Sequence, residues 1–354
     1  MLDRLRIRNY RVFGDLEVTR LSRVNVVAGG NNAGKTSLLE ALFLLSGGGN
    51  PHLALNPSIT RTANDIETRS DARITGDSVR ETLWKPLFFG FDFDRTIEIT
   101  AHHQPCGGLS LTVALEPRTN STFPLEDAGR ADQGLFDQQL TLRFQQGDGP
   151  AIRAAVQLSA KDIHFKHHHE KVPFAASLHS SISRTGREDA ILLGTLRKRK
   201  QGDVLLKPLQ AIEPRLRSIV DNSSSGWPMI WGDVGLPELV PLSVMGEGMT
   251  RFASIVLGFV SAKNGLVLID EVENGIHHSV LTDMWRVIDD SSRRYGVQVF
   301  ATTHSFECVQ AADQAIQTDD LALHRLEVDE GRCRCVTYER SEIAAAIRHD
   351  IEVR

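Results

Sequence analysis

The sequence has few cysteines, no long apolar run and no excess of basic residues. Four cysteines in 354 residues are too few and too badly spaced for a disulfide framework or a four-ligand zinc site. No run of about 18 apolar residues could span a membrane, and the opening MLDRLRIRNYRVFGD lacks the apolar core of a signal peptide. The net charge of −5 argues against a chain coated with basic residues for wrapping nucleic acid and leaves room only for local basic patches. These absences predict a cytoplasmic globular protein without a membrane partner, whose thiols Cys106, Cys308, Cys333 and Cys335 are reduced.

A glycine-rich loop stands between an apolar strand and an apolar helix in the segment 26–46, VVAGGNNAGKTSLLEALFLLS. Its glycines, lysine and threonine match G-x-x-x-x-G-K-[ST], a pattern that surrounds phosphates with backbone N–H groups and places a hydroxyl on Mg²⁺. The helix that follows adds the positive end of its dipole. A glycine turn before a core helix is the plain alternative. The pattern favours a nucleotide site, and its ATP-binding candidates are Gly29, Gly30, Asn31, Asn32, Ala33, Gly34, Lys35, Thr36 and Ser37.

The first half of the chain shows the period of two that is typical of strands. Residues 2–18 alternate around Gly14 and predict a β-hairpin that leads into a strand at 24–28 and a helix at 36–46. Residues 91–159 alternate again, and GDGP at 147–150 is typical of a turn, so an antiparallel sheet built from hairpins is expected.

Helical patterns become common further along the chain. Residues 160–235 are mixed and predict helices at about 190–206 and 208–220. From residue 241 strands and helices alternate, which predicts βαβ units. The expected helices are 249–262, 279–295, one from Ser305 and a short one at 342–349, and the expected strands are 266–269, 297–302 and a hairpin at 322–338.

Two acids and a histidine follow neighbouring strands. Asp270 comes directly after the apolar run 266–269, at the end of a strand where an open α/β sheet binds ligands, and it could share Mg²⁺ with Thr36. Glu271 could take a proton from an attacking water. His304 follows the next buried strand, in ATTHS, and is expected within reach of a γ-phosphate. Solvated side chains at strand ends are the plain alternative, which the phosphate loop disfavours.

The order of these motifs resembles that of the ABC-type ATPases, in particular the RecF, SMC and OLD-like AAA branch. The resemblance rests on IRNYRVFGD, GGNNAGKTSLLEAL, PLSVMGEGMTR, LVLIDEVENGIHHS and QVFATTHS. It implies that two protomers face each other head to tail around ATP and Mg²⁺, and that each site pairs one phosphate loop with the partner's signature motif. By position, Asp270 and Glu271 match the Walker B pair and His304 the switch histidine, so Glu271 and His304 are the implied catalytic residues.

The resemblance also implies a D-loop and a signature. Asn274 to His277 match the D-loop, with Asn274 and His277 as its site residues. The signature departs from the family pattern, because Glu247 stands between two glycines where the family has a serine and glycines. As an alternative to contact with a partner's nucleotide, an acid is favoured in a first helical turn, and the glycines could shape the loop. The trans-signature candidates are Gly246, Glu247 and Gly248.

The predicted fold class is α/β, a P-loop NTPase of ABC-ATPase type, with a mixed sheet, an antiparallel β lobe and a helical insertion. Residues 1–90 are expected to form the N-terminal part of the ATPase core and residues 91–235 the β-rich lobe and helical insertion. Residues 236–354 are expected to carry the signature, Walker B and switch histidine. OLD-type relatives often carry a Toprim nuclease after the core, and the stretch after His304 is too short for one.

Several smaller features have competing interpretations. The histidines of HFKHHHEK, residues 164–171, cannot easily converge on one ion, so a solvated loop is favoured over a metal site. A solvated face is favoured over nucleic-acid contact for the run 197–200, RKRK. Phe13 is expected in the core, near adenine-recognition candidates in the first hairpin. The Q-loop glutamine is not assigned among Gln138, Gln139, Gln145 and Gln146.

The predicted function is an ATP-hydrolysing switch that dimerises around ATP and controls a separate effector protein. A nuclease is the candidate effector, in phage defence or DNA processing. Two alternatives stay open: a RecF-type repair ATPase that binds DNA directly, and the nucleotide-binding subunit of an ABC transporter, against which the incomplete signature argues. A scaffold that binds ATP without hydrolysis is disfavoured because the loop lysine, both Walker B acids and the histidine are all present.

Overall fold

The computed structural model describes residues 1–53, 80–104, 107–118, 135–159, 163–166, 172–180, 186–222 and 228–348. The chain forms two compact units. Unit 1 contains residues 1–21, 31–174 and 326–336, and unit 2 contains residues 22–30, 175–325 and 337–354. The chain therefore passes between the units several times, and neither unit is one continuous stretch.

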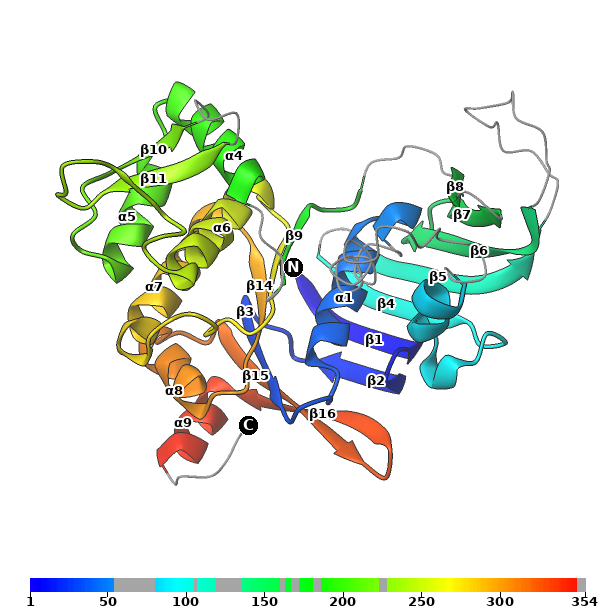
Figure 1. Cartoon of the computed structure of the whole chain (residues 1–354). Coiled ribbons are helices and arrows are strands. Elements are labelled where there is room, and N and C mark those ends of the chain that lie inside the picture. Colours follow the sequence, from blue (N-terminus) through cyan, green and yellow to red (C-terminus); the bar gives the residue numbers. More distant parts are fainter. Residues whose placement is uncertain are drawn as a thin grey trace. The chain divides into compact units, whose positions relative to one another are not determined.

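Unit 1 is built on a seven-stranded antiparallel sheet with the order β2-β1-β4-β5-β6-β7-β8 (Figure 1). The strands are β1 (Leu2–Tyr10), β2 (Phe13–Thr19), β4 (Ile97–His103), β5 (Gly107–Pro117), β6 (Leu135–Gln146), β7 (Ile152–Ser159) and β8 (Ile163–Lys166). Apolar residues pair across the strands in one row, in which Ile7 faces Leu16 and Ile99, and Leu111 faces Ile99 and Phe144. All five are buried. The period of two in the sequence thus produces one buried face.

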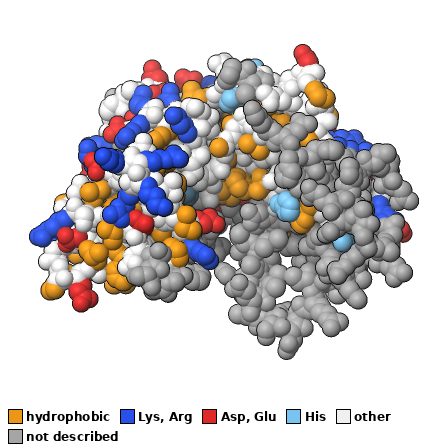
Figure 2. Space-filling view, turned by 90° about the horizontal axis from the view of Figure 1, so that it is seen from above, with side chains coloured by type: hydrophobic (Ala, Val, Ile, Leu, Met, Phe, Trp, Pro, Cys, Tyr) orange, Lys and Arg blue, Asp and Glu red, His pale blue; other side chains and the backbone are white. Residues whose placement is uncertain are grey.

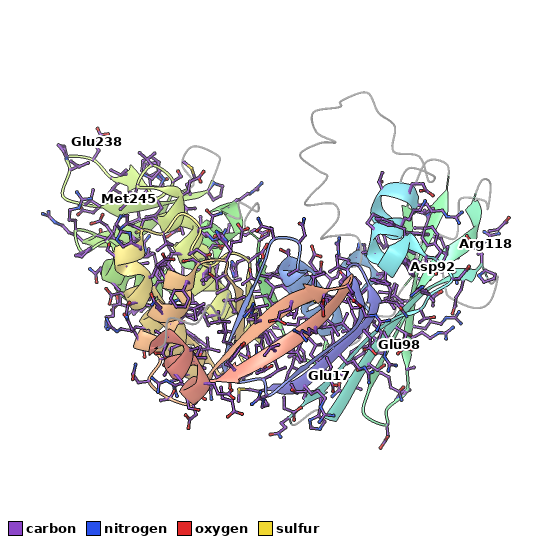
Figure 3. The ribbon with its side chains drawn as sticks, turned by 90° about the horizontal axis from the view of Figure 1, so that it is seen from below. Glu17, Asp92, Glu98, Arg118, Glu238 and Met245 are labelled. Carbon is purple, nitrogen blue, oxygen red and sulfur yellow. The ribbon has the colours of Figure 1, made fainter. Side chains whose placement is uncertain are left out.

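Helix α1 (Lys35–Ser46) packs against β4 and β5 of this sheet (Figure 1). The alternate positions of the strands carry charged pairs instead, such as Arg8 with Glu98, and Glu17 and Glu98 are labelled on this sheet in Figure 3. Three short helical turns precede β4, namely η1 (Arg80–Trp84), η2 (Lys85–Leu87) and η3 (Phe89–Phe91).

A six-stranded mixed sheet with the order β16-β15-β3-β14-β13-β9 provides the frame of unit 2. Its strands are β3 (Val24–Gly29), β9 (Ala176–His179), β13 (Leu266–Ile269), β14 (Gln298–Thr302), β15 (Leu321–Asp329) and β16 (Arg332–Glu339), the last two extending into segments of unit 1. The strands β3, β14, β13 and β9 are parallel. Every residue of β3, β13 and β14 is buried, including the polar Asn25, Gln298 and Thr302, as is typical of parallel strands covered on both faces.

Helices of unit 2 cover this sheet, and α6, α7 and α8 lie together beside it in Figure 1. Phe252, Trp285 and Val299 represent the shared core of α6, α7 and β14. The helices are α4 (Gly186–Lys198), α5 (Asp203–Ile212), α6 (Glu247–Ser261), η4 (His278–Val280), α7 (Leu281–Tyr295), α8 (Phe306–Ala315) and α9 (Arg340–Arg348). A small sheet consists of β10 (Ser218–Asn222), β11 (Met229–Asp233) and β12 (Val240–Pro241).

The structure confirms the predicted α/β class, with its mixed sheet, antiparallel lobe and helical insertion. The hairpin at 2–18, the strand at 24–28 and the alternating elements after residue 241 are present, with ends that differ by up to a few residues. Helix α1 begins at Lys35, one residue earlier than expected.

The two helices predicted between residues 190 and 220 are wrong in their bounds. Helix α4 ends at Lys198, because Lys200 adopts a left-handed conformation with φ 60° before α5 starts. Pro208 lies inside α5 instead of starting a helix. The end of the second predicted helix belongs to β10, whose hydrogen-bond partner β11 comes later in the sequence.

Parts of some predictions fall on residues outside the described ranges, namely Cys106, His349 and residues 167–171 of the histidine-rich segment. His164 lies on β8 and is exposed. Within the described part of the chain, no helix is long and apolar enough to cross a membrane.

Candidate functional site

Gly34 ends the glycine-rich loop in unit 1 and precedes the first residue of α1. Its φ of 94° is a left-handed conformation that side chains rarely adopt. A Cβ atom at this position would lie 2.6 Å from Cγ2 of Val12 and 2.7 Å from the ring of Phe13. Both conformation and space therefore require glycine here, and the buried Phe13 has the packing role expected of it.

The start of α1 is suited to an anion. Asn31 and Asn32 are exposed, Lys35 and Thr36 are half-buried, and the first turn contains no acidic residue that would oppose the helix dipole. The loop begins in unit 2, where Gly29 ends β3 with φ 147° and Gly30 is exposed. The chain therefore passes directly from a buried parallel strand into the phosphate-loop pattern.

Two side chains of unit 1 support this loop and its helix. Nε of Arg11, in the turn after β1, lies 2.7 Å from Oε2 of Glu40 on α1, and both side chains are largely buried. The Cys333 thiol donates to the backbone oxygen of Ala33 at 3.4 Å, and burial raises the pKa of Cys333 to about 11. At neutral pH the thiol therefore keeps the proton that it donates.

In unit 2, β3, β14 and β13 are neighbouring parallel strands, so their carboxyl ends meet at one edge of the sheet. Asp270 follows β13 and is 5% exposed. Its Oδ1 accepts a hydrogen bond of 2.8 Å from Oγ1 of Thr302, the last residue of β14. The carboxylate is thus held by a neighbouring strand, and its second oxygen is not used by this contact.

Glu271 continues from Asp270 in a strained backbone conformation, with φ 50°. Its backbone N–H donates to Oγ1 of Thr302 at 2.7 Å. Arg251 of α6 donates from Nη2 to the backbone oxygens of Asp270 and, at 3.1 Å, of Glu271, and from Nη1 to that of Ser180 at 3.4 Å. Burial lowers the pKa of Arg251 below its ordinary value, although the nearby carboxylates act in the opposite direction. One guanidinium thereby links the first turns of α6 to both acids.

His304 follows β14 at the same edge, and its side chain is 57% exposed. The acid in contact with it is Glu273, whose Oε1 lies 3.3 Å from Nδ1 of His304. The same oxygen accepts from the backbone N–H of His304 at 3.1 Å and from Oγ1 of Thr303 at 2.8 Å.

The signature candidates stand at the start of α6. Gly246, with φ 130°, and Glu247 are exposed, whereas Gly248 is buried. A Cβ atom on Gly248 would lie 2.1 Å from the backbone oxygen of Gly275 in the predicted D-loop. Gly248 therefore has an intrachain packing requirement, and only Gly246 and Glu247 present open surface.

The D-loop candidates are both exposed. The backbone N–H of Asn274 donates to the backbone oxygen of Glu271 at 3.0 Å, which closes a tight turn after the acids. Nδ1 of His277 accepts from the backbone N–H of Ser279 at 3.3 Å and so caps the short helix η4.

A buried histidine lies beside the acids on the edge strand β9. The backbone oxygen of His179 accepts from the backbone N–H of Asp270 at 2.9 Å, and its Nε2 lies 2.9 Å from Oγ of Ser177. Burial, and secondarily the charge of Arg251, lowers the pKa of His179 from 6.5 to about 4. Gly258 of α6 permits this packing, since a Cβ there would lie 2.2 Å from Nε2 of the histidine.

At one sheet edge of unit 2 the structure thus brings together Asp270, Glu271 and His304. The loop residues from Asn31 to Ser37 belong to unit 1. Sequence reasoning missed three residues that hold this edge in place, Thr302, Arg251 and Glu273. All three lie within the motif segments, but their partners are at least about 20 positions away, so no local pattern reveals the contacts.

The described residues suit a metal that arrives with a nucleotide. No group of three or more His, Cys, Asp or Glu side chains among them is arranged to hold an ion alone. Mg²⁺ bound to a nucleotide needs only one or two protein ligands, because phosphates and water complete its shell. The half-buried hydroxyl of Thr36 and the carboxylate of Asp270 are donors of the required oxygen type.

Comparison with known proteins shows the family to which this chain belongs. Residues 24–307 match the AAA_21 family, described as "AAA domain, putative AbiEii toxin, Type IV TA system". An "ATP/GTP phosphatase" of Helicobacter pylori is 25% identical over 349 residues, which cover 91% of this chain and 90% of that protein. An uncharacterized protein of Methanocaldococcus jannaschii is 40% identical over 65 residues, 18% of this chain and 57% of that protein.

Solved structures of SMC head domains are also similar. The SMC head domain from Thermotoga maritima has a TM-score of 0.45 at 13% identity, over 96% of this chain and 99% of its own. An Smc head domain with an extended coiled coil, bound to the C-terminal domain of ScpA derived from Pyrococcus furiosus, has a TM-score of 0.49 at 11% identity. That alignment covers 99% of this chain and 100% of the other.

Proposed function

The chain belongs to the AAA_21 family, and we propose that it is an Mg²⁺-dependent ATPase of ABC type that acts as a dimeric switch. The observation that carries the proposal is the sheet edge of unit 2. There Asp270 is fixed by Thr302, Glu271 follows it, and β3 leads from the same edge into the phosphate loop.

Each residue at these positions has a chemical role in the proposal. The backbone N–H groups of the loop and Lys35 hold the nucleotide phosphates, and Thr36 and Asp270 hold Mg²⁺, which neutralises phosphate charge. Glu271 accepts a proton from the attacking water. His304 contacts the terminal phosphate, and its exposed ring is accessible for that contact.

In the proposed dimer, Gly246 and Glu247 at the start of α6 face the nucleotide of the partner. Gly248 packs against the backbone of Gly275 in the same chain. Asn274 and His277 lie on the D-loop beside them. Residues 1–90 and 236–354 serve as the two parts of the ATPase core, and residues 91–235 carry the motion to a separate effector protein. The family description, which names a putative toxin of a toxin–antitoxin system, supports a role in such a system or in defence. A nuclease stays the candidate effector on the sequence resemblance alone.

Direct DNA binding is the second candidate, and the basic run 197–200 at the end of α4 is the observation that favours it. Figure 2 shows Lys and Arg side chains at the left of the described surface, interspersed with acidic and apolar ones. Arg197 is already paired with Asp221 at 2.7 Å. Salt-dependent retention of DNA by the purified chain distinguishes the two functions.

The test compares ATP turnover and oligomeric state in wild type, Lys35→Ala and Glu271→Gln. Lys35→Ala is expected to lose nucleotide binding, whereas Glu271→Gln is expected to keep ATP bound and to accumulate a dimer measured by light scattering. Removal of Mg²⁺ with EDTA should stop turnover by wild type. Equal turnover by wild type and Lys35→Ala would overturn the ATPase assignment, and a monomeric Glu271→Gln in saturating Mg·ATP would overturn the dimeric switch.

A further inference from the structure

Glu273 combines three contacts on one carboxylate oxygen. Oε1 accepts from Oγ1 of Thr303 at 2.8 Å and from the backbone N–H of His304 at 3.1 Å, and it lies 3.3 Å from Nδ1 of the His304 ring. The Glu273 side chain is 12% exposed, whereas that of His304 is 57% exposed. The largely buried carboxylate of Glu273 thus contacts the solvent-accessible imidazole of His304.

The other oxygen of Glu273 makes the arrangement costly. Oε2 is buried and has no hydrogen-bond partner among the described residues. A buried carboxylate with an unsatisfied oxygen loses solvation that its remaining contacts offset only in part. The two hydrogen bonds to Oε1 satisfy only one of the two oxygens, and the contact with the histidine ring gives a further reason for an acid at this position.

The position of Oε1 determines which ring nitrogen carries the proton. A lone pair on Nδ1 would face a negatively charged oxygen at 3.3 Å, whereas an N–H at Nδ1 would be attracted to it. With Nδ1 protonated, Nε2 on the far side of the ring is the nitrogen that takes up or releases a further proton. The resulting imidazolium would have its charge balanced by Glu273.

We infer that Glu273 is the positioning residue of His304: it fixes the Nδ1–H tautomer and the ring orientation, so that Nε2 points away from Glu273 and, when it carries a proton, can donate to a phosphate oxygen of a bound nucleotide. Glu271, which precedes it in the same segment, keeps the separate role of proton acceptor for water. The functional part of this inference rests on the proposed ATPase activity, whereas the tautomer does not.

The first experiment measures the tautomer in the full-length, nucleotide-free chain. The protein is labelled with ¹⁵N-histidine, and the His304 signals are assigned among the 13 histidines by their loss in His304→Gln. Wild type is expected to show a protonated Nδ1 and an unprotonated Nε2. Glu273→Ala is expected to shift His304 towards protonation at Nε2. An Nε2–H tautomer in wild type, or identical His304 signals in Glu273→Ala, would overturn the inference.

The second experiment separates binding from turnover. Glu273→Ala is expected to lower kcat about 10-fold to 100-fold, as loss of an orienting carboxylate typically does, with the Kd for a fluorescent ATP analogue changed less than about twofold. Glu273→Gln keeps an oxygen that can accept from the ring and should retain an intermediate kcat, which also covers the case in which the alanine variant does not fold. The matched control, Asp283→Asn on α7, removes an exposed acid and should leave kcat unchanged.

The outcomes distinguish the two proposals. If wild type shows no ATP turnover, the proposed function fails while the ¹⁵N signals still decide the tautomer. If wild type turns over ATP and both Glu273 variants keep its kcat, the ATPase stands and the positioning role is wrong.

Discussion

His179 is a buried titratable residue whose charge state couples folding to pH. Its ring lies between Ser177 of the same strand and Ser254 of α6, at 2.9 Å and 3.4 Å. Burial lowers its pKa from 6.5 to about 4, so the folded chain holds the neutral ring at pH values where the unfolded chain binds a proton. The stabilisation by the neutral ring is complete above pH 6.5 and is lost as the pH falls towards 4.

We expect this residue to reduce the free energy of unfolding by about 1.4 kcal/mol for each pH unit below 6.5, until the folded-state pKa is reached. His179→Gln removes the titration and keeps a polar group. Urea unfolding at pH 7 and pH 5 should therefore show a smaller loss of stability in His179→Gln than in wild type. The exposed His278→Gln is the control and should follow wild type, and a wild-type pH dependence in His179→Gln would contradict the assignment.

Single residues differ in how far the sequence predicts them. Lys35 and Thr36 could be named as candidates from the sequence because the phosphate-loop pattern is contiguous and its chemistry depends on local backbone geometry. Glu273 could not be identified in this way, since its proposed role depends on contacts with Thr303 and His304, which follow another strand about thirty positions later. For Glu247 the sequence left two interpretations, and its exposed position at the start of α6 is compatible with both.

Arg251 connects helix α6 to the loop that follows strand β13. Its guanidinium donates to the backbone oxygens of Asp270, Glu271 and Ser180, so movement at the start of α6 is transmitted to both acids. Arg251→Ala would leave these oxygens without that donor and loosen the conformation of Glu271, which already has a strained φ.

We expect Arg251→Ala to lower kcat about 10-fold to 100-fold, because it removes support from the carboxylate proposed to hold the metal. The Kd for ATP should change little, since the phosphate loop does not include this residue. Steady-state turnover and fluorescent-nucleotide titration measure the two quantities. Arg286→Ala on α7, where the side chain is exposed, is the control. A parallel loss of binding, or an unchanged kcat, would show that α6 does not support the acids through this side chain.

The elements that the sequence predicted share a strong local pattern. Most strands of the hairpin at 2–18 and of the sheet at 91–159 alternate apolar and polar residues, and β13 and the centre of β14 are short apolar runs followed by polar residues. The four-residue strand β9 has no such pattern, and it is a strand because β13 supplies its hydrogen-bonding partners. Likewise, β10 is a strand because it pairs with β11. The helical spacing of leucines that begins in α5 led to the prediction of a helix over these residues instead.

The division of the chain into two units could not be predicted from the sequence, because each unit is built from several separate stretches. Residues 22–30 bring β3 into unit 2, while the next residues belong to unit 1, so the phosphate-loop pattern itself contains a unit boundary. A composition shift marks linkers between consecutive domains, but it gives no signal when a chain passes repeatedly between two units. The proposed roles of residues 1–90, 91–235 and 236–354 therefore have to be tested by their effects on ATP turnover and dimerisation, because these segments do not coincide with the two units.

A mixing experiment tests whether the site is completed by a second copy. Lys35→Ala disables the phosphate loop, and Gly246→Asp places bulk and negative charge at an exposed position whose added Cβ meets no atom of the same chain within 4 Å. Each variant alone should be inactive. The φ of 130° at Gly246 also strains any side chain there, so the Gly246→Asp chain must first be shown to fold. In a head-to-tail dimer, a mixed pair has one site with both lesions and one site with neither. The mixture should recover about a quarter of the wild-type rate, because random pairing gives about half mixed dimers with one intact site each.

The recovered rate should also depend on protein concentration, since it requires association. It should disappear when the Gly246→Asp chain also carries Glu271→Gln, because that chain supplies Glu271 to the intact site. Unfolding curves of both single variants serve as the folding control. No recovery in a mixture whose mixed dimers are detected by light scattering would mean that each chain uses its own α6. In that case Gly246 and Glu247 act within the chain, and the contact between Gly248 and Gly275 would be the reason for the glycines at this turn.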